Sequence, residues 1–462
     1  ATEIPHLKAG GWGIGMDYRR LAQDLMREAE KQGASAADAV IVEDESFSVQ
    51  VRMREVDTLK SAREKRLGLR VFLGQRSATT ATSDFSSASL GRLVADTLAM
   101  AAAMPEDPFG GLPDPGAFPS GLPDLDLWDA EVAALPIPDR IGLAREAEAA
   151  ALACDPRIVN SEGSEYEHRD ARILFANSHG FAGDYRASSA SLSVTPVAKD
   201  DGGMQRDGWY SVARRLHRLE SPEAVGRIAA RRTLRRLGAR KVATQEVPVV
   251  FDPDMAASLL GSLCSAVSGS TIYRGTSFLV GKLGEHVAAP GLSVVDDGRM
   301  PGGLGSRPFD GEGLPTRRTV VIQDGVLTSY LLDTYTGRKL GLASTGNASR
   351  CLSQRPTVGP TNFHVVPGVR SPEEIIRSVD RGLYVTEMIG FGVNLVTGDY
   401  SRGAVGIWIE KGELTHPVEE VTIAGNLKEM LCGIEMIGSD LEWRSSVASP
   451  TIKIARMTVA GN

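Results

Sequence analysis

The stretch richest in groups that could do chemistry is a short polar run between two apolar segments, at residues 397–403. Its sequence, Thr-Gly-Asp-Tyr-Ser-Arg-Gly, combines a carboxylate, a phenol, a hydroxyl and a guanidinium with backbone that two glycines keep flexible. Polar groups on a flexible segment between rigid elements often form a binding site. The pattern therefore indicates a binding loop, and the alternative is a hairpin segment with no further role. The side chains concerned are Asp399, Tyr400, Ser401 and Arg402.

Residues that could bind a metal ion are present but are not spaced as a metal site requires. The seven histidines are scattered, with no two at ligand spacing. The densest set is Glu165, Glu167 and His168, yet side chains on a strand alternate between its two faces. The glutamates would then face one side and the histidine the other, which favours a solvated strand edge over a metal site. His286, beside Glu285, is interpreted as a surface residue.

Signatures of nucleophilic catalysis and nucleotide binding are also incomplete. Cys264 lies among leucines in an apolar helical stretch, so we expect it in the core. No G-x-S-x-G element surrounds the serines at 265–270, and the glycines at 281–284 and 302–305 lack the spacing or context of phosphate and dinucleotide loops. The cysteines form no C-x-x-C pair, which is typical of a reducing compartment and makes the cytoplasm the expected location. They are Cys154, Cys264, Cys351 and Cys432.

The elements that must position these residues divide the chain into two parts, and the expected fold class is α+β. Residues 16–245 read as a domain of helices and antiparallel strands, after a flexible extension at 1–15. A Pro- and Gly-rich excursion at 105–126 interrupts this domain. Residues 246–462 carry many short strands and Gly-rich turns, which predicts a β-rich domain of barrel or sandwich type.

Local patterns place several elements more closely. Asp252 is the predicted N-cap of a helix that runs to Val267, and a second helix, rich in arginine, opens at Ser221. A basic helical face usually lies against solvent or acidic neighbours, so nucleic-acid contact is not favoured. The predicted strands of the N-terminal domain fall at 39–42, 47–54, 67–74, 77–82, 158–169, 171–177 and 180–195.

Composition excludes several classes of protein. The chain has 462 residues, 42% hydrophobic and 24% charged, which is enough material for two cores. Its 51 basic and 58 acidic residues give a net charge of −7, which disfavours general binding to nucleic acid or to anionic membranes. No apolar run approaches the roughly 20 residues that span a bilayer. Residues 1–15 are not expected to be a secretory signal, because they lack a basic segment followed by an apolar one.

Four sequence blocks, spread in order over residues 245–460, carry a resemblance to a known family. On them the C-terminal half closely resembles the TldD/PmbA family, on its PmbA (TldE) side. The N-terminal half resembles the family more loosely, through its element order and residues 66–72. The blocks are IYRGTSFL with KLG (272–284), RPFDGEG with GVL (307–327), YTGRKLGL with STGNA (335–348) and GVNLVTGDYSRGAVGIWIEKGELTHPVEEVTIAGNLKEML (392–431).

The resemblance also implies where zinc chemistry would lie and that this chain lacks it. In the catalytic branch an HExxxH helix follows the strand that opens the C-terminal domain. Its histidines bind zinc, and its glutamate acts as the general base that accepts a proton from water. The helix at 252–267 stands in that place. Aligned on its apolar pair at 259–260, Gly261 and Ala266 replace the histidines and Ser262 replaces the glutamate. None of the three can bind zinc or act as a general base.

A late cysteine completes the zinc ligands of the catalytic branch. The matching place here is roughly residues 445–449, which contain serines and no cysteine. Cys432 lies upstream and does not align with it. The resemblance therefore implies no cofactor and no catalytic or metal-binding residue in this chain.

The resemblance implies that this chain is the non-catalytic subunit of a heterodimeric zinc metallopeptidase. Its partner would be a TldD-like subunit that carries HExxxH and the zinc. The implied substrates are unstructured peptides, in microcin maturation and in the degradation of antitoxin-like peptides, with a historical link to gyrase modulation; no membrane partner is implied. The residues expected to contact peptide or partner are Tyr273, Arg274, Ser277, Asp399, Tyr400, Ser401 and Arg402.

Two other hypotheses stay open on the sequence. The chain could be a self-sufficient peptidase or hydrolase whose catalytic groups are dispersed through the fold, or a non-enzymatic, peptide-binding homodimer. The zinc content of the isolated chain separates the hydrolase from the other two. Co-purification with an HExxxH-bearing chain separates the heterodimer subunit from the homodimer, although the subunit could also form homodimers in isolation.

Overall fold

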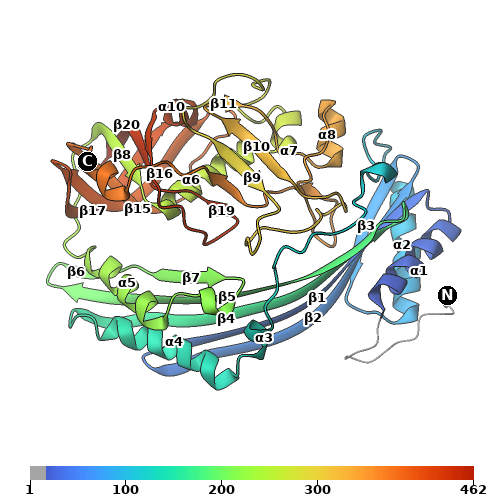
Figure 1. Ribbon diagram of the computed structural model, residues 1–462, viewed down its shortest axis with the longest axis horizontal. Helices are drawn as coiled ribbons and strands as arrows, with labels where there is room; N and C mark the ends of the chain where they lie inside the picture. The colour runs from blue at the N-terminus through green and yellow to red at the C-terminus, as the bar shows by residue number, and fades with distance from the viewer. Residues whose placement is uncertain (1–16, 462) are drawn as a thin grey trace.

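The computed structural model describes residues 17–461, so the extension predicted for residues 1–15 lies outside the described chain. A long, curved antiparallel sheet with helices on one face makes up the N-terminal part, and a β-rich part lies over the other face (Figure 1). This arrangement confirms the predicted α+β class and the barrel-like character of the C-terminal part. No helix within residues 17–461 is long and apolar enough to cross a membrane.

Long strands dominate the N-terminal sheet, which has the order β3-β2-β1-β4-β5-β6 with β7 paired to β5. The breaks predicted at 43–46 and at 170 are wrong, because β1 pairs with β2 and β4 through the first stretch and β4 pairs with β1 and β5 through the second. β2 also begins at Glu55 rather than at 67. The strands are β1 (Ala36–Arg52), β2 (Glu55–Leu73), β3 (Arg76–Thr82), β4 (Ile158–Asn177), β5 (Ala182–Asp200), β6 (Gly203–Arg206) and β7 (Trp209–Ala213).

Side chains alternate between the two faces of this sheet, as the period of a strand requires. On the apolar face Leu69 and Leu174 pack under α1 and α2, while Phe47 and Tyr166 pack under α4 and α5. The opposite face carries many serines and charged side chains and is overlaid by the C-terminal part (Figure 1). The helices are α1 (Tyr18–Lys31), α2 (Ser87–Ala103), α3 (Ala130–Ala134), α4 (Ile137–Leu152) and α5 (Pro222–Leu234), with 3₁₀ turns at Pro115–Ala117 and Leu216–Arg218.

A closed five-stranded barrel organises the C-terminal part. Its strands follow the order β17-β16-β15-β8-β20, and β17 pairs with β20 to close it. A second sheet, ordered β11-β10-β9-β14-β19, lies beside the barrel with helix α6 between them (Figure 1). Leu259, Leu260 and Leu263 of α6 share one core with Phe251 of the barrel and Val294 of the second sheet.

The bounds of the C-terminal elements complete this description. The barrel strands are β8 (Gln245–Phe251), β15 (Arg381–Ile389), β16 (Asp399–Glu410), β17 (Glu413–Asn426) and β20 (Ile452–Ala460), with β18 (Ile434–Ile437) paired to β20. The second sheet contains β9 (Val294–Asp297), β10 (Arg318–Gln323), β11 (Val326–Leu327), β14 (Phe363–Val365) and β19 (Val447–Ala448), and β12 (Ala348–Ser349) pairs with β13 (Thr357–Val358). The helices are α6 (Pro253–Ala266), α7 (Gly269–Tyr273), α8 (Thr334–Leu340), α9 (Pro372–Arg377) and α10 (Leu427–Cys432).

A buried group of ions joins the two parts of the chain. The Asp38 carboxylate of β1 accepts a hydrogen bond from Arg70 of β2. It also forms an ion pair with Arg350, which follows β12 in the C-terminal part. Glu312, another residue of the C-terminal part, lies 3.7 Å from Arg70. All four side chains are less than a tenth exposed, so these charges are balanced by each other rather than by water.

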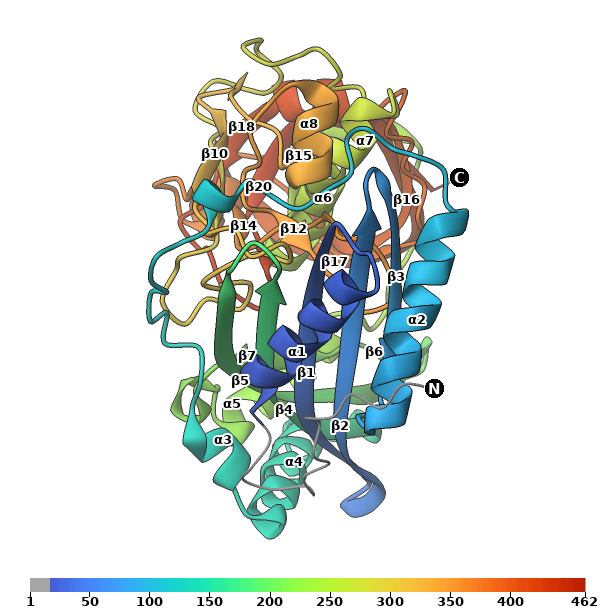
Figure 2. The same cartoon turned by 90° about the vertical axis from the view of Figure 1, so that its right-hand side faces the viewer.

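The predicted excursion at 105–126 also joins the two parts. It leaves α2, passes beside α7 and α8 and returns to the sheet at α3 (Figure 2). The Tyr335 hydroxyl of α8 donates to the Asp107 carboxylate, and Arg338 donates to the carbonyl of Leu112. The segment is therefore a strap across the C-terminal part, held by side chains of α8.

Candidate functional site

Helix α6 is the element that the sequence places at the centre of the site. It begins directly after β8, where the Asp252 carboxylate accepts the N–H of Met255 and Pro253 occupies the first turn. This is the predicted N-cap, and the helix ends one residue before the predicted end. Burial raises the pKa of the Cys264 thiol to about 12, so the cysteine is a neutral core residue, as predicted.

The side of α6 that would carry a zinc motif has no zinc ligand. Nothing lies within 4 Å of the place where a Cβ of Gly261 would stand, so the helix has room for a side chain that it lacks. Ser262 offers one half-buried hydroxyl. Ala266 is buried, and its carbonyl accepts the Ser277 hydroxyl at 2.7 Å. These residues do not fit a zinc ion, because they supply no imidazole, thiolate or carboxylate.

Residues elsewhere in the described part of the chain do not replace the missing ligands. Within residues 17–461, one group of His, Cys, Asp and Glu side chains comes close enough to share an ion: Asp129, Glu131 and His217. Both carboxylate oxygens of Asp129 already accept backbone N–H groups, from Glu131 and Leu216. Asp129 therefore caps α3 and also holds the backbone at Leu216. His168 is buried under α4 and α5, away from Glu165 and Glu167, as predicted, but β4 is an inner strand and not the edge that we expected.

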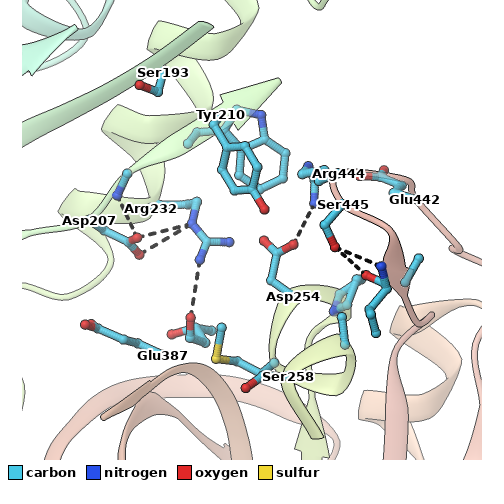
Figure 3. Close-up of a pocket in the computed structure, with 18 of the residues that line it drawn as sticks. Ser193, Asp207, Tyr210, Arg232, Asp254, Ser258, Glu387, Glu442, Arg444 and Ser445 are labelled. Carbon is cyan, nitrogen blue, oxygen red and sulfur yellow. Dashed lines mark hydrogen bonds and ion pairs between the residues drawn. The ribbon is translucent and has the colours of Figure 1, made fainter. Parts of the chain in front are cut away.

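A cavity of about 620 Å³ lies at the N-terminal end of α6, between the two parts of the chain (Figure 3). The N-terminal part supplies β5, β7 and α5, and the C-terminal part supplies α6, the end of β15 and the segment before β19. No histidine or cysteine is among the described residues that line it. The polar and aromatic residues of its wall are Ser193, Thr195, Asp207, Trp209, Tyr210, Arg232, Asp254, Ser258, Thr386, Glu387, Glu442, Arg444 and Ser445.

The charges of this cavity are arranged in pairs, and some of the contacts join the two parts. Arg232 of α5 lies 3.4 Å from Asp207 (Figure 3) and 3.6 Å from Asp252. Arg444 lies 3.3 Å from Asp254 and stacks 3.9 Å from the ring centre of Trp209. Burial raises the pKa of Asp252 to about 6, although Arg232 opposes that shift. The wall is therefore a set of fixed donors and acceptors, which suits hydrogen bonding to a peptide backbone.

The same geometry gives no nucleophile. The serines of the wall, among them Ser193, Ser258 and Ser445, have no histidine beside them to remove a proton. Ser258 instead accepts a hydrogen bond from Arg402, and Ser445 donates to the carbonyl of Val447 at 2.7 Å. The cavity can hold and orient a ligand, but its own side chains do not form a hydrolytic centre.

The structure changes the predicted loop at 397–403. β16 begins at Asp399, so the second half of that stretch is strand, and the loop runs from 390 to 398 instead. Asp399 pairs with Asn426, and Tyr400 with Gly425, across the barrel wall. The prediction was wrong there because polar residues can continue a strand when a partner strand takes up their backbone. Phe391, which no pattern had singled out, is 99% exposed on the actual loop.

The four predicted residues of that stretch have different surroundings. Arg402 reaches α6, where its Nη1 donates to the Ser258 hydroxyl at 2.9 Å. Asp399 accepts the Thr397 hydroxyl at 2.6 Å, so it does not pair with Arg402. The Tyr400 side chain is buried in the barrel core, and Ser401 is exposed. Arg402 is therefore the predicted residue that the structure brings to the edge of the cavity.

The other predicted group lies near α7. The buried Ser277 hydroxyl bonds to the end of α6. The Arg274 guanidinium lies against Tyr273, whose ring meets the edge of Tyr335 with the ring centres 5.9 Å apart. Phe278 donates from its backbone to the 390–398 loop, so this segment and that loop are neighbours. Tyr273 and Arg274 do not line the cavity beside α6, and their contact with a peptide or partner stays a prediction.

Most of the cavity wall was not found from the sequence. Arg232 was noted only as part of a basic helix, and its packing against Asp207 and Asp252 confirms the interpretation of acidic neighbours. Trp209 and Arg444 meet from parts of the chain more than two hundred residues apart, so no local motif marks them. The one usable signal is Asp254 with Ser258, four residues apart on the polar side of α6.

Comparisons with known proteins agree along nearly the whole chain. The family model described as the PmbA/TldA metallopeptidase C-terminal domain matches residues 244–461, the central-domain model 130–237 and the domain 1 model 37–101. The last two regions share the single N-terminal sheet. Metalloprotease PmbA of Escherichia coli O157:H7 is 38% identical over 430 residues, which are 93% of each chain.

Solved structures extend this agreement to three dimensions. A proposed modulator of DNA gyrase from Bacteroides thetaiotaomicron, 30% identical, matches with a TM-score of 0.90 over 97% of this chain and 100% of that one. TldE from Thermococcus kodakarensis, 23% identical, matches with a TM-score of 0.86 over 95% and 99% of the two chains, which shows the same fold. On these matches, the chain belongs to the TldD/PmbA family of metallopeptidases.

Proposed function

We propose that this chain is the PmbA/TldE-type, non-catalytic subunit of a two-subunit zinc metallopeptidase that acts on unstructured peptides. One observation carries the proposal: helix α6 keeps its place after β8, its N-cap and its open side, but Gly261, Ser262 and Ala266 supply no zinc ligand. Cleavage by a zinc metallopeptidase requires a bound zinc ion, so another chain has to supply the ligands. The proposed partner is therefore a TldD-like chain with HExxxH, and the family does include chains named TldD homologs.

The role of this chain in the pair is to bind peptide and to complete the cleft. The cavity beside α6 presents hydroxyls, carboxylates and guanidiniums, and ion pairs hold several of these side chains in place, so few of them have to be ordered when a peptide binds. Such groups can form hydrogen bonds to a peptide backbone of any sequence. They can do so only if the backbone is not already paired in secondary structure, so the substrate has to be unstructured. Microcin-like and antitoxin-like peptides in the cytoplasm are the substrates that we propose.

Activity measurements on the separate and combined chains test the proposal. The chain is expressed alone, with an HExxxH-bearing partner from the same cell, and with a partner whose motif glutamate is changed to glutamine. Cleavage of an internally quenched, unstructured peptide should require both chains and should be lost with the changed partner. Cleavage by the isolated chain would favour the self-sufficient hydrolase. Peptide binding by a homodimer that never associates with such a partner would favour the non-enzymatic alternative.

A further inference from the structure

A second cavity, of about 490 Å³, lies between the concave face of the N-terminal sheet and the loops of the C-terminal part. It shares no lining residue with the cavity beside α6. Strands β1, β2, β4 and β5 supply one wall, and residues 307–311 and 349–353 supply the other. Four arginines line it: Arg66, Arg169, Arg307 and Arg350.

Three of these arginines already face a carboxylate. Arg169 lies 2.6 Å from Asp44, Arg350 lies 2.6 Å from Asp38, and the exposed Arg66 lies 3.5 Å from Glu64. Their charges are compensated within the chain. The cavity as a whole is thus less basic than the count of arginines would indicate.

Arg307 differs from the other three. Its Nε and Nη2 atoms are buried without a hydrogen-bond partner, and among residues 17–461 it forms no ion pair within 4 Å, although Asp310 and Asp296 interact with its charge at longer range. A buried donor that is charged and unbonded is costly, so such groups usually meet a water or a ligand. Nε and one Nη of a guanidinium form a fork whose spacing matches the two oxygens of a carboxylate.

The nearby acid does not use this fork. Asp310 lines the same cavity, but its Oδ1 accepts the N–H groups of Glu312 and Leu314, and its Oδ2 accepts that of Ala348. These bonds hold the loop that carries Arg307. They leave Arg307 as the arginine of the cavity that forms no ion pair within 4 Å in the described chain.

The rest of the wall is apolar and aromatic. Val40 and Phe175 lie on the sheet side and Phe309 on the other, and the ring of Tyr185 meets the edge of Phe309 with the centres 5.3 Å apart. A ligand that fits both features has one anionic group beside an apolar group. A phosphate fits less well, because it carries nearly two charges against one arginine without an ion pair, with the Asp310 carboxyl close by.

We propose that this cavity binds the C-terminal carboxylate of a peptide, with the fork of Arg307 on the carboxylate and the last, apolar side chain against Phe309 and Tyr185. The inference rests on the proposed function in taking a peptide as the ligand. It adds that the chain recognises the C-terminal end of the peptide, at a place separate from the cavity beside α6.

The test compares two peptides that differ in one group. A fluorescein-labelled, unstructured peptide that ends in leucine is prepared with a free carboxylate and with a C-terminal amide, and the Kd of each for the full chain is measured by fluorescence polarisation. The free carboxylate should bind about tenfold or more tightly, as expected for one charge-assisted contact. Equal Kd values for the two peptides would overturn the proposal.

Variants locate the effect. Arg307→Gln should remove the difference between the two peptides, and Arg307→Lys should restore only part of it, while Arg318→Gln, an exposed residue outside the cavity, should leave it unchanged. If Arg307→Gln does not fold, judged by its thermal transition, Val42→Glu serves instead, because it places a competing carboxylate on the cavity wall. A difference that persists in the folded variants would contradict the assignment.

Competition identifies the chemistry of the anion. At matched ionic strength acetate should displace the peptide, and stronger displacement by inorganic phosphate would contradict a carboxylate site. This result is independent of the proposed function. A preference for the free carboxylate would stand even if no HExxxH partner existed, and an active heterodimer without this preference would remove only the present inference.

Discussion

Replacement of Asp38 by asparagine should destabilise the chain strongly while leaving its shape unchanged. Asp38 is fully buried, and its two oxygens face Arg70, with Nε at 2.8 Å, and Arg350, at 2.6 Å. In Asp38→Asn the two buried guanidiniums keep one nearby acid, Glu312, at 3.7 Å from Arg70. Removal of one member of a buried ion group costs about 3–5 kcal/mol, because a buried charge is left without compensation.

This free energy converts into a measurable shift of the melting temperature. At about 2.1 cal/mol/K per residue, the unfolding entropy of a chain of this length is about 1 kcal/mol/K, so Tm should fall by about 3–5 °C if the chain unfolds as one unit. Calorimetry of the wild type and the variant measures the shift. Asp155→Asn, which breaks an exposed pair with Arg157, is the control and should leave Tm almost unchanged.

The pH dependence of the shift provides a second check. Burial opposes the charge on Asp38, but Arg350 and Arg70 outweigh it and hold the pKa of that carboxyl below its ordinary value. A carboxyl whose pKa is lower in the folded state stabilises the fold above its unfolded pKa of about 3.9, and this contribution is lost as the pH falls through the folded pKa. The difference between the wild type and Asp38→Asn should be full at pH 7 and shrink below about pH 4. A Tm change below 1 °C at pH 7, or a difference that grows on acidification, would refute the reasoning.

Three further predictions concern the cleft and the contact between the two parts. Arg402→Ala should weaken peptide cleavage by the complex about tenfold or more, as expected for one lost charge-assisted contact, with little change in Tm. Arg402→Lys should restore little of the cleavage, and a double-mutant cycle with Ser258→Ala should show that the effects of the two substitutions on cleavage are not additive. An activity loss that only follows unfolding would contradict this role. Gly68→Ala should lower Tm and Gly116→Ala should not, because a Cβ at Gly68 would lie 2.3 Å from a backbone oxygen of the C-terminal part, whereas Gly116 has open space. Asp252→Asn should become more stable relative to the wild type as the pH rises from about 4 to about 6 in urea titrations. The reason is that folding raises the pKa of Asp252 to about 6, so the wild type loses folding stability as the pH rises through this range. A difference in unfolding free energy between the two proteins that stays constant over that range would contradict the shift.

The sequence predicted the fold class and the position of α6 because these depend on local signals. Asp252 and Pro253 mark the start of that helix, and Asp324 with Gly325 marks the turn between β10 and β11. The long strands β1 and β4 were divided in the prediction because polar residues on the concave face resemble loops. Their continuity depends on neighbouring strands, which supply hydrogen bonds wherever the side chains are polar.

The candidate site was less predictable for a related reason. The absence of ligands at Gly261 and Ala266 was readable, because the family resemblance fixed where ligands would stand. The wall of the cavity was not, since Arg232, Trp209 and Arg444 come together only when the C-terminal part packs on the sheet. Residues that lie this far apart in the chain form no local motif with a characteristic spacing.

The zinc content of the purified chain tests the central claim most directly. The chain is prepared alone and together with its HExxxH-bearing partner, each is supplied with zinc and dialysed, and metal per chain is measured by inductively coupled plasma mass spectrometry. Because Gly261, Ser262 and Ala266 supply no ligand, the isolated chain should retain essentially no zinc, and the pair should retain about one ion, held by the partner. About one tightly held zinc ion in the isolated chain would contradict the account.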